Sequence, residues 1–217
     1  MPLDTLEDVL AHDLSDLLSA ENQFSKALKQ VIKAADSAEV KQMAEEHLQE
    51  TEGQIENLKQ AFATLGQKPE KGLVCKAAQG IVEENSSTLK EEKPKGAIKD
   101  LVLACGSLKI EHYEIAGYTA AIATAKALGQ REVAQLLQAN LKQEQATAKK
   151  LEAGAQQILL LAKGGTAPTA TAGATKAGAT KSGGSKSGGS KGGSKSGGSK
   201  SGGSKGGASK NGGASDS

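Results

Sequence analysis

The stretch LKIEHYEIAGY, residues 108–118, carries two carboxylates three residues apart, Glu111 and Glu114, inside an otherwise apolar helical pattern. Side chains at steps of three and four share one face of a helix. Here that face comprises Leu101, Ala104, Leu108, Glu111, Ile115, Tyr118 and Ile122. Glu111 therefore stands where a leucine would be expected. Because a buried, ionised carboxylate costs several kcal/mol when nothing compensates it, a proton, a partner or a metal ion must accompany Glu111.

Four long amphipathic segments and one short one are predicted along the front of the chain. Short turns at residues 35–37 and 128–130 join the long segments into two antiparallel hairpins, and residues 66–95 cross from one hairpin to the other. One long crossover of this kind is typical of ferritin-like four-helix bundles. The sequence thus predicts an all-α, ferritin-like four-helix bundle with a short extra helix in the crossover. The predicted helices cover residues 4–34, 38–65, 73–91, 96–127 and 130–163.

Each long segment has a glutamate near its middle, on or beside the apolar stripe: Glu21, Glu50, Glu111 and Glu144. If these four converge, they repel one another and raise each other's pKa values. Divalent cations relieve such repulsion because hard cations take oxygen ligands. The candidate ligands of a di-metal site, holding iron or manganese, are Glu21, His47, Glu50, Glu111, Glu114 and Glu144. The alternative is that some of these glutamates turn to the surface and that the bundle binds no metal.

Composition divides the chain into a bundle, residues 1–164, and a Gly/Ser/Lys-rich tail, residues 165–217, which we expect to be disordered. The tail carries eight Lys and one Asp, whereas the front has 19 Lys and Arg against 24 Asp and Glu. Spaced lysines can neutralise phosphates without reading bases, so the tail suggests non-specific DNA binding. The alternative is a solubilising tail or a weak tether for acidic partners. The lysines concerned are Lys176, Lys181, Lys186, Lys191, Lys195, Lys200, Lys205 and Lys210.

Compartment and membrane association follow from simpler features. The two cysteines, Cys75 and Cys105, form no CxxC motif and no disulfide framework. No apolar run approaches the roughly 20 residues that cross a bilayer. The acidic start MPLDTLEDVL lacks the basic region and apolar centre of a signal peptide. We therefore expect a soluble, cytoplasmic protein that does not enter a membrane.

Two strings carry a family resemblance. HLQETEGQIENLKQAFATLGQKP (47–69), followed by Cys75-Lys76-Ala77, and KIEHYEIAGY (109–118) resemble the YciF-type branch of the ferritin-like superfamily. The similarity extends over roughly residues 3–162 and includes the crossover helix. It implies a rubrerythrin-like four-helix bundle, a homodimer, and a link to bacterial stress responses.

The sequence also departs from the usual di-metal ligand pattern. Di-iron and di-manganese bundles take Glu-x-x-His from two helices, and no Glu-x-x-His occurs here; the second helix has the reverse order, His47-x-x-Glu50. A site of these residues is rich in carboxylates and poor in histidine. Two hypotheses follow: a di-metal carboxylate protein that handles iron, manganese or peroxide and has possible oxidase activity, or a non-enzymatic dimeric stress protein without bound metal. No catalytic residue is assigned.

Overall fold

The structure, a computed structural model, describes residues 3–165 and shows five α-helices and no strand within that range. Every predicted helix is present, and each boundary lies within three residues of its predicted place. The all-α prediction of four long helices and a short crossover helix is therefore confirmed. The helices are α1 Leu6–Ala34, α2 Ala38–Leu65, α3 Lys76–Glu91, α4 Gly96–Ala127 and α5 Arg131–Ala162.

Local capping explains where the first two helices begin. The Thr5 hydroxyl accepts a hydrogen bond from the Asp8 amide at 3.1 Å, and the Asp8 carboxylate accepts one from the Thr5 amide at 3.0 Å. This reciprocal capping box satisfies amides that the first turn leaves unpaired. Ser37 caps α2 with a single bond, because its hydroxyl accepts from the Val40 amide. Gly66 ends α2 with φ 64°, a left-handed conformation that glycine adopts without steric cost.

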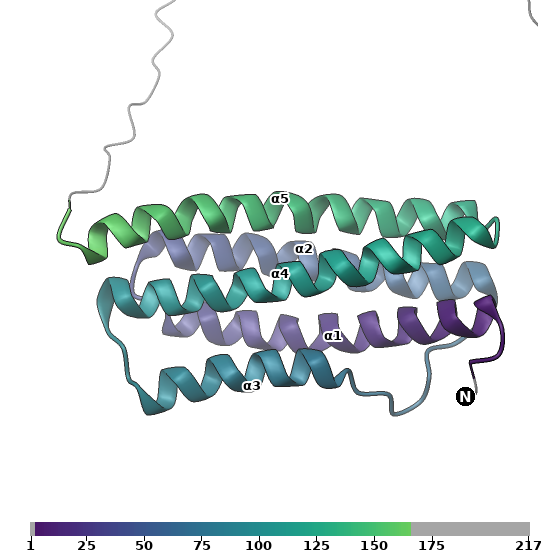
Figure 1. Ribbon diagram of the computed structural model, residues 1–217, viewed down its shortest axis with the longest axis horizontal. Helices are drawn as coiled ribbons and strands as arrows, with labels where there is room; N and C mark the ends of the chain where they lie inside the picture. The colour runs from purple at the N-terminus through teal and green to yellow at the C-terminus, as the bar shows by residue number, and fades with distance from the viewer. Residues whose placement is uncertain (1–2, 166–217) are drawn as a thin grey trace, which may run out of the picture. The chain divides into compact units, whose positions relative to one another are not determined.

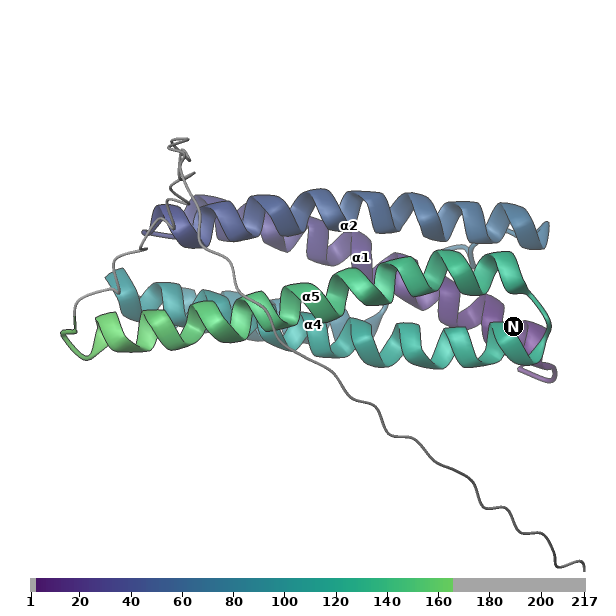
Figure 2. The same ribbon diagram turned by 90° about the horizontal axis from the view of Figure 1, so that it is seen from above.

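The long helices form two hairpins, α1–α2 and α4–α5, which pack against each other (Figure 1). Helix α1 lies beside α2 and α4, and α5 lies beside α2 and α4, so α1 is diagonal to α5 (Figure 2). The short helix α3 covers the side formed by α1 and α4. This is the ferritin-like arrangement that the single long crossover predicts.

Two apolar clusters fill the ends of the bundle. One contains Leu10, Leu14, Leu58, Phe62, Ile122 and Leu137, and the other contains Ala35, Val40, Leu103, Ala104 and Ile158. Along every long helix, the segment between the two clusters carries buried polar residues, with a few apolar ones such as Leu28 and Leu151 among them. The bundle therefore encloses a polar layer between two apolar plugs that keep water away from it.

A buried aspartate ties the two hairpins together at one end. The Asp100 carboxylate, on α4, accepts hydrogen bonds from the amides of Asp36 and Ser37, at 2.8 and 2.9 Å. The Asp36 carboxylate in turn accepts from the Gly96 amide and from Lys99. The start of α2 and the start of α4 are thereby fixed against each other.

Within the described residues, no helix is long and apolar enough to cross a membrane. The predicted tail, including all of its lysines from Lys176 to Lys210, lies outside the described residues. The division into residues 1–164 and 165–217 therefore stays a prediction.

Candidate metal centre

The polar layer is built from glutamates that no water reaches. One comes from α1, two from α4 and one from α5, and none is more than 1% exposed; a histidine of α2, 3% exposed, faces them. Their side chains point inward because each occupies a core position of its helix. These residues are Glu21, Glu111, Glu114, Glu144 and His47.

Four of these five side chains meet at one point. His47, Glu111, Glu114 and Glu144 each offer a ligand atom, and these atoms all lie within 4.8 Å of one another. The Nε2 atom of His47 is 3.0 Å from Oε1 of Glu111. Neither atom has a hydrogen-bond partner. The two atoms are therefore close together but are not aligned as a hydrogen bond requires.

Neighbouring donors fix one oxygen of two glutamates and leave the other bare. The Tyr118 hydroxyl donates to Oε1 of Glu21, and the Gln54 amide donates to Oε1 of Glu144. The remaining oxygen of each, Oε2, is buried without a partner. Both oxygens of Glu111 and Oε1 of Glu114 also have no hydrogen-bond partner, although contacts of Glu111 with Glu144 and of Glu21 with Glu114 contribute to their pKa values. Buried polar atoms nearly always have a partner, so this concentration of bare oxygens calls for a ligand or for protons.

A second row of amides holds these donors in place. The side-chain amide nitrogen of Asn140 lies 3.0 Å from the Tyr118 hydroxyl and 3.3 Å from the backbone carbonyl oxygen of Gln54, and it donates to both. The Asn57 side-chain amide donates to Oδ1 of Asn140 at 2.6 Å. The orientation of Glu21 and Glu144 is therefore set from outside the cluster, as with metal ligands whose outer partners orient them.

Burial dominates the electrostatics of the layer. Desolvation, followed by repulsion from Glu144, raises the pKa of Glu21 to about 8. Desolvation also raises the pKa of Glu111 to about 8, and it raises the pKa values of Glu114 and Glu144 well above their usual range. The pKa of His47 is lowered, again mainly by desolvation. Without a cation, the layer is therefore rich in protonated carboxyls around a neutral imidazole.

Glu50 lies apart from the other candidate ligands. It is half-buried, accepts a hydrogen bond from Thr147 at 2.7 Å, and has Lys150 at 3.8 Å. The similarity of α2 and α5 explains where Glu50 lies. When residues 47–58 of α2 are aligned without a gap to residues 140–151 of α5, Thr51 pairs with Glu144, and Glu50 does not. Thr51 accordingly takes the buried position. Glu50 sits one residue off it, about 100° around the helix.

His112 and Tyr113 follow Glu111 in the sequence but lie outside the glutamate cluster. His112 follows Glu111 but is exposed, 3.9 Å from Glu152. Tyr113 donates to Asp16 at 2.6 Å, and its hydroxyl is 2.8 Å from the Cys75 sulfur. These contacts fix α3 on α1 and α4 and have no part in the glutamate cluster.

Comparison with known proteins places this architecture in a family. The profile of DUF892, a domain of unknown function, matches residues 5–162. The chain belongs to the DUF892 family. Protein YciF of Escherichia coli K12 is 38% identical over 151 residues, which cover 70% of this chain and 90% of YciF. The resemblance to the YciF-type branch that the sequence suggests is thereby confirmed.

Solved structures that match this chain agree with the fold. The crystal structure of the E. coli stress protein YciF matches with TM-score 0.69 and 36% identity, over 72% of this chain and 98% of YciF. YcfI from Rhodopseudomonas palustris matches with TM-score 0.66 and 38% identity, over 70% of this chain and 97% of that one. A Xanthomonas campestris protein, 21% identical with TM-score 0.57 over 72% of this chain and 94% of its own, shares the fold.

The cluster fits a divalent cation by its chemistry. It offers several carboxylate oxygens and one imidazole nitrogen, all buried, and most of the oxygens lack a hydrogen bond. Hard divalent ions such as Mn²⁺ prefer oxygen ligands, and imidazole is compatible with iron and manganese. A neutral His47 leaves a ring nitrogen lone pair free to coordinate.

Proposed function

We propose that this DUF892 protein binds divalent iron or manganese, in a di-metal site, within the polar layer of its bundle. The single observation that supports this most is the set of buried carboxylate oxygens with no hydrogen-bond partner, on three helices around His47. Glu111, Glu114, Glu144 and His47 would hold the first ion, and the bare oxygen of Glu21 would extend the set toward a second. Glu50 would contribute only if its side chain turned inward.

Bound iron or manganese would supply Lewis acidity and one-electron chemistry, which suits the handling of metal or peroxide. The protein's own groups prepare the site. Tyr118 and Gln54 orient Glu21 and Glu144 so that one oxygen of each remains available. The apolar plugs exclude water, so an ion would compete with protons rather than with solvent. Ion binding should therefore release protons from the carboxyls.

Metal analysis of the purified chain, loaded with Mn²⁺ or Fe²⁺ without oxygen and then gel-filtered, tests the proposal. We expect bound metal in the wild type and a large loss in Glu111→Ala and in Glu21→Ala. Glu45→Ala, which changes an exposed glutamate of α2, is the matched control and should retain the metal. Near-zero metal in every sample, with the wild type folded, would refute the proposal.

A non-enzymatic bundle is the alternative that the raised pKa values favour. Protonated carboxyls can donate to one another, and contacts between Glu111 and Glu144 contribute to their pKa shifts. In that case the layer is held by shared protons, and the protein acts through its surface. Glutamate variants would then keep all activity of the wild type in vivo, which separates the two functions.

Two further predictions concern partners. A homodimer is expected from the family resemblance, and sedimentation velocity would test it. Non-specific DNA binding is expected from the lysines between Lys176 and Lys210. Truncation after Lys163 should abolish a salt-sensitive gel shift, because the counterion term is lost with the lysines. A shift that persists after truncation would exclude that role for the tail.

A further inference from the structure

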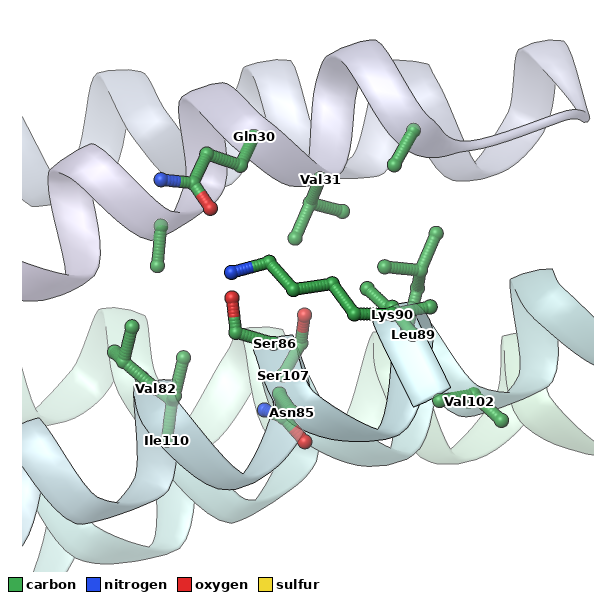
Figure 3. A pocket seen from close by; sticks show the side chains of 13 residues that line it. Gln30, Val31, Val82, Asn85, Ser86, Leu89, Lys90, Val102, Ser107 and Ile110 are labelled. Carbon is green, nitrogen blue, oxygen red and sulfur yellow. The ribbon is translucent and has the colours of Figure 1, made fainter. Parts of the chain in front are cut away.

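A pocket of about 180 Å³ opens between α1, α3 and α4, beside the polar layer (Figure 3). Its walls are apolar side chains of all three helices, including Val31, Val82, Leu89, Val102 and Ile110. The pocket is therefore a hollow enclosed by three elements of one chain, of the kind that takes small ligands.

Polar groups gather at this pocket without partners of their own. Five lining side chains, from Gln30, Asn85, Ser86, Lys90 and Ser107, form no hydrogen bond or ion pair with any described residue. In Figure 3 the Lys90 side chain extends across the pocket toward Gln30 and Ser86. Glu84, an acidic residue of the same helix, pairs instead with Lys109 at 2.9 Å. Lys90, an exposed residue in the last turn of α3, thus brings a positive charge that no described carboxylate pairs with to an apolar hollow.

Gly106 of α4 leaves room for the Asn85 side chain of α3 at the wall of this pocket. A Cβ atom at Gly106 would lie 2.3 Å from the Asn85 amide nitrogen, so only glycine lets α3 approach α4 with Asn85 in this place. Asn85 thereby becomes part of the pocket lining.

We propose that this pocket binds a small carboxylate with an apolar chain, its head group against Lys90. A dry cavity of about 150 Å³ holds benzene, so the size here suits a chain of about six to eight carbons. Gln30 and Ser86 can donate further hydrogen bonds to the carboxylate. The pocket lining has one ammonium group and no arginine, so it suits the single negative charge of a carboxylate better than the charge of a phosphate.

The pocket adjoins the candidate metal centre, although the proposal does not depend on a metal. Val31, Leu103 and Ser107 line the pocket and also a small void of about 10 Å³ whose wall includes His47. A bound chain would therefore lie one layer of side chains from His47.

Calorimetric titration of the full chain with octanoate and with 1-octanol tests the proposal. We expect saturable one-to-one binding of octanoate. Lys90→Met keeps the apolar stem and removes the charge, so octanoate should bind about three- to tenfold more weakly, with octanol unchanged. Lys76→Met, at the other end of α3, is the matched control and should bind octanoate as the wild type does.

Filling the hollow gives an independent check. Ala27→Phe should abolish binding of both compounds while helix content by circular dichroism stays unchanged; Ser107→Leu, from α4, serves if Ala27→Phe does not fold. The proposal is wrong if the wild type binds neither compound or if the filled variants still bind. It is also wrong if Lys90→Met and Lys76→Met behave alike.

Discussion

Replacing Glu111 with glutamine should make the metal-free protein less sensitive to pH. Burial raises the pKa of Glu111 to about 8, from an ordinary value of 4.5. Between these values the folded chain keeps the proton that the unfolded chain has lost, so the free energy of unfolding falls as pH rises. The loss is about 1.4 kcal/mol per pH unit for one group between the two pKa values, and it flattens near each of them, so it sums to roughly 3–4 kcal/mol between pH 5 and pH 8. Glutamine carries no such proton in either state.

The assay is urea unfolding, followed by circular dichroism, in chelator-treated buffers from pH 5 to pH 9. Relative to the wild type, Glu111→Gln should gain roughly 3–4 kcal/mol across pH 5 to pH 8. His47 opposes the trend below its ordinary pKa of 6.5, because a lowered pKa favours folding as pH rises; it does so in both proteins. Glu45→Gln, at an exposed position, should follow the wild type. Parallel curves for the wild type and Glu111→Gln would refute the reasoning that Glu111 is buried and protonated.

Three further predictions concern the same layer and its frame. Between pH 6 and pH 8, Mn²⁺ affinity should rise up to tenfold per pH unit for each proton that the ion displaces, because Glu21 and Glu111 have pKa values of about 8. Titration calorimetry measures this affinity, and an affinity that does not change with pH would contradict the prediction. Tyr118→Phe leaves Oε1 of Glu21 without its donor and should cost about 1–3 kcal/mol in urea unfolding at pH 8, so an unchanged midpoint would count against that bond. Asp100→Ala removes the acceptor of two amides at the start of α2 and should cost about 2 kcal/mol, which thermal unfolding would show as a lower midpoint.

Much of the architecture was predictable because it depends on local patterns. Helical periodicity and short turns place five helices, and the single long crossover selects the ferritin-like topology. Buried positions followed from the same periodicity: Glu21, Glu111 and Glu144 stand in apolar stripes and are buried. Their role as metal ligands remains a prediction.

The details that sequence reasoning missed depend on contacts between distant residues. Nothing local shows that Gln54 donates to Glu144, because the two are 90 residues apart. Asp100 lies next to the turn at residues 35–37 only once both hairpins have packed. The sequence places Glu50 at the edge of its stripe, and aligning the hairpins, which pairs Thr51 with Glu144, supports that place. The signal for a buried Gln54 was the spacing of three and four residues that places it on one face of α2 with His47 and Thr51.

The central claim is that a cation replaces protons among the buried glutamates. Anomalous diffraction from crystals grown with Mn²⁺ at pH 8 tests it most directly. We predict an anomalous peak within coordination distance of His47, Glu111, Glu114 and Glu144. The claim would be contradicted if the layer were well ordered at saturating Mn²⁺ and showed no anomalous peak, with the same carboxyls in contact with one another.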